Sequence, residues 1–323
     1  MLRLYSEISI GNLVFDYVSE VEINTSWETL TDTAMISLPS NITNKDNTFI
    51  KDIIQVNDPV TIKLGYYPNL VTRFVGYVSK VIPESPLKVM CEDEAFILKQ
   101  TNIDNYSAKN VTLEKLITDN YDGETNIIDA TLGNFRIDKV SLIKVLQELK
   151  SKYKIWSWFR DGVLNAGLTF VPGTGTKKNF GFQDNIIDGK NLEALNETEI
   201  NTVAHGISTQ KDGTKIELYT YYENGHIVTK GGNPGGDLNT MSIPNRTEAQ
   251  LKELLERWLP NIYYSGFSGQ ITSYGEPVVN HGDIAVIEDL RFPEKNGSYA
   301  IKGVRITFGQ DGYRQIIDLD RRL

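Results

Sequence analysis

The sequence predicts a mainly β protein with a small α+β insert between two β domains. Apolar and polar residues alternate with a period of two through much of residues 1–100 and again through residues 264–319, as in strands with one buried face. Helical periodicity is concentrated between these regions. The 323 residues suit two or three domains. We therefore expect a first β domain over residues 1–100, an α+β insert over residues 101–200 and a second β domain over residues 201–323.

The region Tyr264–Leu319 is the clearest β signal. Val304, Ile306 and Phe308 fall on one side of a run, and the residues between them are polar. Turn signals separate the runs at residues 274–277, 281–283, 295–297 and 310–312. We expect a meander of about four strands, close enough to form a small barrel. Its polar outer face would suit a wall better than a catalytic site.

The N-terminal region shows the same alternation in shorter runs. Residues 34–38 alternate before Pro39 ends the run, and residues 60–64 and 71–82 form two further expected strands. Gly76 lies inside the last of these, where a glycine indicates a bulge or a close backbone approach.

The middle region carries the helical signals. A short helix should begin after Thr112, whose hydroxyl can cap it. Leu142, Leu149 and their neighbours recur at three- and four-residue intervals, which predicts an amphipathic helix over residues 141–152. A hairpin is expected at Asp161-Gly162, after an aromatic strand.

One further helix is expected in the second β domain, over residues 248–259. Thr247 and Gln250 have capping-box spacing, and Pro260 should end the helix. Its apolar stripe is expected to lie against the meander that follows.

Composition limits the functional classes. The net charge is −9 and the pI is about 5.0, which is unsuited to a nucleic-acid clamp. An acidic surface would instead repel a passing strand of nucleic acid. We expect no membrane anchor, because no run of about 18 apolar residues is present. We expect no signal peptide, because the N-terminus has no basic segment followed by an apolar core. A single cysteine, Cys91, excludes an internal disulfide framework.

A weak internal similarity links the two β domains. Residues 57–62 resemble residues 282–287, and each segment precedes a strand that contains a glycine, Gly76 or Gly303. Duplication and a chance match between two β domains are both compatible with this similarity.

No residue lies in a recognisable catalytic, cofactor-binding or metal-binding pattern, so we expect no enzyme and no cofactor. The three histidines lack metal-ligand spacing, and Cys91 suits a small core residue. Glu92-Asp93-Glu94 could bind a cation, but a solvated turn is the simpler interpretation. Trp156 and Trp158 could form a sugar platform, although core packing is favoured. The weaker candidates are His205, His226 and His281, the stretch Asp184–Gly189, which lacks calcium-loop ligands, and Gly173–Lys178, which lacks phosphate-loop spacing.

The order and spacing of several segments support a family resemblance. The segments are Asp32–Pro39, Arg73–Val78, Leu142–Tyr153, Asp161–Gly167, Gly266–Gly269, Gly275–Pro277, Gly282–Asp283 and Gly309–Arg314. Together they resemble the tail-hub, or baseplate-hub, proteins of tailed phages and related contractile injection systems. The resemblance covers nearly the whole chain, although each motif alone is loose.

This resemblance implies two tube-type β-barrel domains flanking the small α+β domain. Three chains would form a ring with pseudo-sixfold symmetry, located in the virion tail or baseplate and made in the host bacterial cytoplasm. The implied partners are the tail tube protein, a separate spike or tip protein, the tape-measure protein and other baseplate proteins, and DNA would pass without specific binding. Two alternatives remain from the sequence: a carbohydrate-binding adhesin of the tail tip and a peptidoglycan-degrading tail enzyme.

Overall fold

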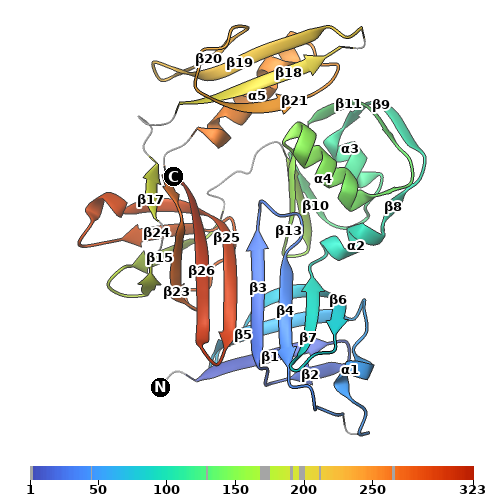
Figure 1. The fold of residues 1–323 in the computed structure, drawn as a ribbon, viewed down its shortest axis with the longest axis vertical. Coiled ribbons are helices and arrows are strands. Elements are labelled where there is room, and N and C mark those ends of the chain that lie inside the picture. The colour runs from blue at the N-terminus through green and yellow to red at the C-terminus, as the bar shows by residue number, and fades with distance from the viewer. Residues whose placement is uncertain are drawn as a thin grey trace.

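The computed structural model describes residues 3–44, 46–128, 130–167, 175–189, 192–195, 201–210, 212–263 and 266–323. The fold is mainly β, as expected, and has four parts (Figure 1). We call them the N-terminal half, the insert, the C-terminal half and the four-stranded lobe.

The N-terminal half is the lower part of Figure 1. Its elements are β1 (Leu4–Ile10), β2 (Leu13–Phe15), β3 (Glu20–Ser26), β4 (Thr33–Leu38), α1 (Ile50–Ile53), β5 (Pro59–Tyr66), β6 (Val71–Ile82) and β7 (Leu87–Glu92). The C-terminal half lies beside it. Its elements are β15 (Lys177–Gly181), β16 (Ile186–Asp188), β17 (Glu193–Leu195), β22 (Gly266–Ser268), β23 (Gln270–Tyr274), β24 (Ile284–Glu288), the 3-10 helix η2 (Pro293–Lys295), β25 (Gly297–Gly309) and β26 (Gly312–Arg322). Thus β15, β16 and β17, which fall inside the range 101–200 expected for the insert, pair with strands of the C-terminal half.

A single sheet runs through both halves in the order β16-β23-β26-β25-β3-β4-β7-β6-β5-β1-β2. Val304, Ile306 and Phe308 point into a core shared by the two halves, and Arg305 is exposed, as the alternation predicted. The expected meander is present as β22–β26, but in the described residues its ladder continues through β25 into β3 instead of closing on itself. Long-range pairing of this kind has no local sequence signal.

The insert has its own core around one helix. Its elements are α2 (Ala95–Gln100), β8 (Asn102–Ile103), β9 (Tyr106–Thr112), α3 (Leu113–Thr118), β10 (Thr125–Ile127), β11 (Thr131–Ile137), β12 (Val140–Ser141), α4 (Leu142–Tyr153), β13 (Trp156–Arg160) and β14 (Val163–Gly167). Helix α4 buries the predicted stripe, including Leu142 and Leu149. Thr112 caps α3 by accepting the N–H of Lys115, as predicted. The hairpin at Asp161-Gly162 is also confirmed.

The four-stranded lobe is the upper part of Figure 1. It consists of β18 (Thr202–Thr209), β19 (Lys215–Glu223), β20 (His226–Lys230), β21 (Asp237–Ser242) and α5 (Glu248–Ile262). The capping box of Thr247 and Gln250 is confirmed, but two expectations for this helix were wrong. It packs on β18 and β19, which precede it, and it continues past Pro260 to Ile262. Pro260 lacks the N–H that would bond to the carbonyl four residues earlier, and the helix ends two residues beyond it.

Candidate assembly site

The two halves repeat one strand order. In the N-terminal half the neighbours are β5-β6-β7-β4-β3, and in the C-terminal half they are β24-β25-β26-β23-β16. Strand β1 flanks β5 in an antiparallel pair, and β15 flanks β24 in a parallel pair, so the outermost strand differs in direction. The repeat therefore covers five strands of each half.

The turns that precede β5 and β24 have the same hydrogen bonds. The N–H of Gln55 donates to Oδ2 of Asp58 at 2.8 Å, and the N–H of Asn280 donates to Oδ2 of Asp283 at 2.9 Å. Each aspartate returns its own N–H to the carbonyl three residues earlier, at 3.2 Å in both turns. Residues 57 and 282 both have positive φ, 78° and 84°. The similarity between residues 57–62 and 282–287 is therefore also a similarity of backbone geometry.

The strands that follow share an irregularity. Strand β6 shifts register against β7 between Val78 and Lys80, and β25 shifts against β26 between Ile301 and Gly303. Val78 and Ile301 occupy equivalent places, because each donates its N–H to the carbonyl of the turn aspartate at 2.9 Å. Gly303 thus corresponds to Lys80, so Gly76 and Gly303 are not at equivalent positions of the two strands. A shared bulge is a specific feature of a sheet.

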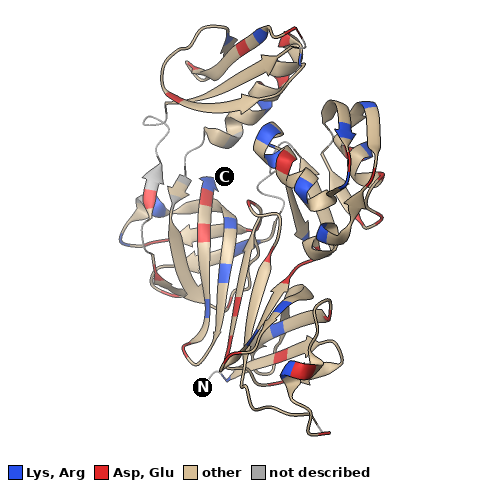
Figure 2. Ribbon diagram, turned by 45° about the vertical axis from the view of Figure 1, so that its right-hand side comes forward, with Lys and Arg blue, Asp and Glu red and all other residues tan. Residues whose placement is uncertain are grey.

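The halves are joined side by side by β3 and β25. Seven antiparallel residue pairs connect them, from Gly303 and Ser26 to Gly309 and Glu20. On the solvent face of this joint, Arg305 donates to Glu22 at 2.8 Å. Figure 2 shows basic and acidic residues along these strands. The joint thus combines a backbone ladder, a shared apolar core and a polar outer face.

A buried arginine makes a second connection between the halves. Arg73 of β6 donates to the hydroxyl of Tyr313 at 2.8 Å, and to the carbonyl of Val279 and Oε1 of Gln315, both at 3.0 Å. All three acceptors belong to the C-terminal half. Burial lowers the pKa of Arg73 and raises that of Tyr313, but both shifts leave the guanidinium charged and the phenol neutral near pH 7. The guanidinium therefore bridges the halves where no backbone ladder is described between β6 and β26.

Solved structures of tail proteins share this architecture. No family model matches the chain, and no curated protein matches its sequence. A tail protein from Neisseria meningitidis superimposes over 98% of this chain and 96% of its own, with a TM-score of 0.64 and 13% identity. The chain has the fold of phage tail proteins. A prophage MuSo2 tail protein from Shewanella oneidensis gives a TM-score of 0.58 at 14% identity and covers 98% of both chains.

The tail-protein fold also occurs in a secretion system. An E. coli component of the type VI secretion system, described as similar to bacteriophage T4 tail proteins, gives a TM-score of 0.55 at 12% identity. That match covers 98% of this chain and 77% of the E. coli chain. No helix in the described part of this chain is long and apolar enough to cross a membrane.

The structure scatters most of the residues considered from the sequence. His226 is exposed on β20, and His205 stacks on Tyr219 within the lobe. Cys91 is buried, and burial raises the pKa of its thiol to about 12, as for an inert core residue. Within the described ranges, no group of three or more histidine, cysteine or acidic residues could hold a metal ion.

The remaining candidates have different surroundings. Trp156 is half-buried and its ring lies 6.1 Å from that of Trp27, so it packs against a neighbour. Gly181 and Asn185 form a hydrogen-bonded turn at the supposed calcium loop. Part of the stretch Gly173–Lys178 lies outside the described residues, and Lys177 and Lys178 belong to β15.

The surroundings of Asp93 and His281 differ from what the sequence predicts. Asp93 is buried, which corrects the expectation of a solvated turn, and His281 lies with Nε2 3.6 Å from Oδ2 of Asp32. Arg73 was not singled out as a bridging residue, because an arginine between Thr72 and Phe74 has the pattern of an exposed strand position.

Proposed function

We propose that this chain is the structural hub of a phage tail or injection-machine baseplate. Three copies would form a pseudo-sixfold ring that joins the sixfold tail tube to a threefold spike or tip and lines the channel. The observation that carries this proposal is the repeated strand order of two halves joined side by side. Three such chains supply six similar units around one axis.

The repeat also suggests how one copy meets the next. Strand β25 extends beyond its pairing with β24, and this extension takes β3 as its neighbour. Strand β6 extends beyond its pairing with β5 in the same way, through Ile82. In the C-terminal half, β16 and β17 occupy the place that β3 has in the N-terminal half. A β17–β6 contact between copies would repeat the β3–β25 joint, and repeated head-to-tail contacts that close give a ring.

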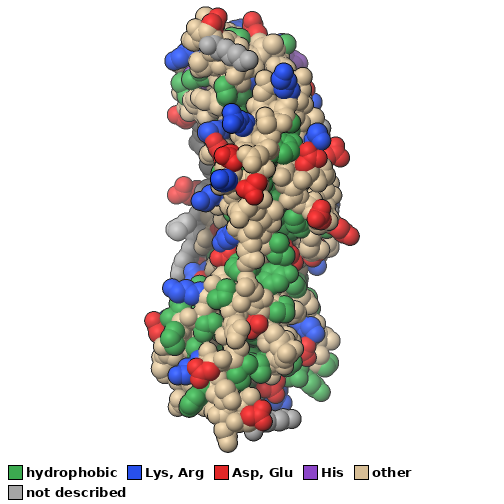
Figure 3. Space-filling view, turned by 90° about the vertical axis from the view of Figure 1, so that its right-hand side faces the viewer, with side chains coloured by type: hydrophobic (Ala, Val, Ile, Leu, Met, Phe, Trp, Pro, Cys, Tyr) green, Lys and Arg blue, Asp and Glu red, His purple; other side chains and the backbone are tan. Residues whose placement is uncertain are grey.

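The positions of these two edges suit such a ring. In Figure 1, β6 lies on the right and the strands next to β17 lie on the left, so one molecule presents the edges on opposite sides. Hydrophobic side chains gather in the lower part of the face in Figure 3, where the N-terminal half lies. Exposed residues of this half include Val71 and Val75 of β6. An exposed edge with apolar neighbours favours a covering partner.

The channel and partners follow from the same arrangement. The polar outer face of β3 and β25, with Glu22 and Arg305, would line the channel. A mixed-charge wall lacks the dense basic charge needed for tight binding of DNA. The tube protein and the spike protein would meet opposite ends of the ring, with tape-measure and other baseplate proteins nearby.

Paired cysteines test the proposed contact. The equivalence of β6 with β25 gives Ile82 the position of Arg305. The proposed contact places it opposite β17 of the next copy, in which Glu193 is an exposed residue. In antiparallel pairs the Cα atoms are about 4.5–5.5 Å apart, which permits a disulfide. We expect Ile82→Cys/Glu193→Cys to yield covalent three-chain species on non-reducing gels after mild oxidation.

The matched control is Asn24→Cys/Arg305→Cys, a cross-strand pair of the β3–β25 joint inside one chain. It should form a link that leaves the mass of a single chain unchanged. Native mass measurement separates the possible failures. A persistent monomer at micromolar concentration would refute the ring, whereas a trimer without the Ile82–Glu193 link would keep the ring and reject this edge contact.

A further inference from the structure

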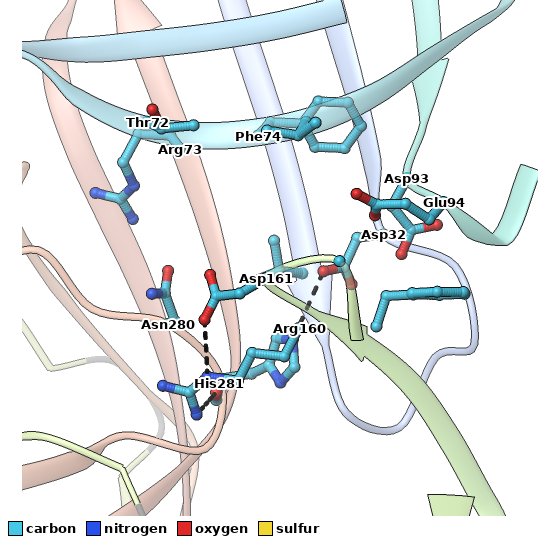
Figure 4. Close-up of a pocket in the computed structure, with 14 residues that line it drawn as sticks. Asp32, Thr72, Arg73, Phe74, Asp93, Glu94, Arg160, Asp161, Asn280 and His281 are labelled. Atoms are coloured by element: carbon cyan, nitrogen blue, oxygen red, sulfur yellow. Dashed lines mark hydrogen bonds and ion pairs between the residues drawn. The ribbon is translucent and has the colours of Figure 1, made fainter. Parts of the chain in front are cut away.

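A cavity of about 400 Å³ lies where the insert meets both halves. It is bounded by β6, by the end of β7, by the tip of the β13–β14 hairpin and by the turn before β24. Figure 4 shows Asp32, Asp93 and Glu94 on one side of it, and Arg73, Asn280 and Asp161 on the other. Mouths of β structures that are capped by another element are common ligand sites.

Three deeply buried polar side chains line this cavity with an unsatisfied atom. Asp93, His281 and Arg73 are 5%, 4% and 6% exposed. Among the described residues, Oδ2 of Asp93, Nδ1 of His281 and Nε of Arg73 have no hydrogen-bond partner. A buried polar atom without a partner costs about 1–3 kcal/mol. Nε of Arg73 can only donate, so Oδ2 of Asp93 is the acceptor that a hydrogen-bond donor in the cavity would satisfy.

The charges around Asp93 are unbalanced. In the described part of the chain, no lysine or arginine forms an ion pair with Asp32, Asp93 or Glu94, and the basic group nearest to Asp32 is the imidazole of His281, at 3.6 Å. The two nearby cations are engaged elsewhere. Arg160 pairs with Asp283 at 3.1 Å, and Arg73 donates to neutral groups of the C-terminal half. The groups facing Asp93 across the cavity or beside it are Asp32, Glu94, Arg73, Arg160, Asp161 and His281.

We propose that this cavity binds an organic cation, an alkylguanidinium or alkylammonium group, against Asp32, Asp93 and Glu94. The group could be a free small molecule or a basic side chain on a peptide, and both present the same chemistry. A compact divalent metal is disfavoured, because no set of three ligands among the described residues is arranged for one. An extended cation can instead donate several hydrogen bonds to separate carboxyl groups.

Binding should release a proton. Burial, and then the nearby charge of Asp32, raise the pKa of Asp93 well above its usual value. A cation in the cavity stabilises the ionised carboxylate, so the protonated Asp93 plus the cation give the ion pair plus one proton in solution. The affinity should therefore rise with pH, by up to about tenfold per pH unit below the pKa of the empty site, and then become constant.

Titration calorimetry on the full chain tests the proposal with ethylguanidinium and butylammonium chlorides as probes. We expect saturable binding, and an enthalpy that changes with the ionisation enthalpy of the buffer in proportion to the proton released. The capped peptide Gly-Arg-Gly tests whether a peptide-borne group also fits. Binding of the free cations but not of the peptide would assign the cavity to small molecules.

Variants locate the binding. Asp93→Asn should weaken ethylguanidinium binding at least about tenfold at neutral pH and abolish the proton release. Glu92→Gln, one residue away, is the matched control, because Glu92 pairs with Lys99 outside the cavity and the change in charge is the same. If Asp93→Asn does not fold, the binding enthalpy of the unmodified chain in buffers of different ionisation enthalpy still shows whether binding releases a proton.

Three results would overturn the proposal. They are no saturable binding of either organic cation, equal affinities in the Asp93→Asn and Glu92→Gln variants, and saturable binding of calcium or magnesium chloride in preference to the organic cations.

Discussion

The N-terminal and C-terminal halves share a strand order, but they differ in what their loops carry. In the N-terminal half, residues 27–32 connect β3 to β4 directly. In the C-terminal half, the equivalent connection between β17 and β22 contains the whole four-stranded lobe. The five-strand order of the sheet is therefore repeated in both halves, whereas the segments inserted between its strands, such as the four-stranded lobe, differ between the halves. Features common to both halves suit a ring of similar units, and features of one half alone suit specific contacts.

The two aspartate turns show this contrast on the scale of single residues. Asp58 accepts the N–H of Gln55 and is partly exposed. Asp283 makes the equivalent bond, but it also accepts from Arg160 of the insert and from the N–H of Thr176, and it is buried. The aspartate side chain thus accepts from its own turn in the N-terminal half, and it holds three segments together in the C-terminal half.

Removing the arginine bridge should have the largest effect on the joint between the halves. Arg73→Met keeps the aliphatic part of the side chain but leaves the Tyr313 hydroxyl, the Val279 carbonyl and Oε1 of Gln315 without this donor. All three acceptors are neutral, so no buried charge is left behind. Hydrogen bonds to a charged donor contribute about 1.5–3 kcal/mol, and the loss should be about 3 kcal/mol. We expect that loss in the free energy of unfolding, measured by denaturant titration.

Tyr313→Phe is the milder companion variant, since it removes one of the three acceptors and nothing else. A loss of about 1 kcal/mol is expected. If Arg73→Met were as mild as Tyr313→Phe, the arginine would not be a principal connection between the halves.

The aspartate turns should respond unequally to the same substitution. Asp283→Ala leaves Arg160 without its buried partner and removes acceptors for two N–H groups, so we expect a loss of about 3 kcal/mol. Asp58→Ala removes one hydrogen bond at a partly exposed turn, for about 1 kcal/mol. Denaturant titration of both variants gives the difference directly.

Limited proteolysis separates the two contributions to the loss of stability in Asp283→Ala, namely the lost pairing with Arg160 of the insert and the lost hydrogen bonds to two N–H groups. If the insert is held through Arg160, Asp283→Ala should speed cleavage of the β13–β14 region, and Asp58→Ala should not. Equal losses of stability and equal cleavage in the two variants would mean that the turns are energetically equivalent despite their different neighbours.

Strands common to both halves could be predicted from the sequence, because their signals are local. Period-two alternation placed Val304, Ile306 and Phe308 in the core, and capping chemistry placed the start of α5 at Thr247. The similarity between residues 57–62 and 282–287 pointed to the two equivalent turns, but by itself it left duplication and a chance match open.

The non-repeated contacts could not be predicted, because they depend on partners distant in the chain. Strand β16 has three residues, too few for a periodic signal, and it pairs with β23 far along the sequence. Asp93 follows an acidic residue and precedes another, a pattern typical of a solvated turn, yet the insert covers it. Burial of Arg73 and Asp93 follows only from how the halves and the insert pack.

The smallest effect is expected from the surface ion pair across the joint. Burial raises the pKa of Glu22, but hydrogen bonds from Asn24 and Arg305 outweigh it, so the pKa in the folded chain lies below the ordinary value. The associated stability is therefore present above the unfolded pKa, about 4.3, and is lost as the pH falls through the folded pKa. The Arg305 side chain is half-exposed, so Arg305→Gln should cost at most about 0.5 kcal/mol at neutral pH.

That cost should shrink as the pH falls through the folded pKa of Glu22 and also in high salt, both measured by denaturant titration. Lys88→Gln is the control, because Lys88 pairs with Glu84 on the surface of the N-terminal half and does not cross the joint. If the two variants behave alike, the ladder and the shared core hold the halves together, and the Arg305–Glu22 pair adds little. A cost above about 2 kcal/mol for Arg305→Gln alone would instead make this ion pair a principal part of the joint.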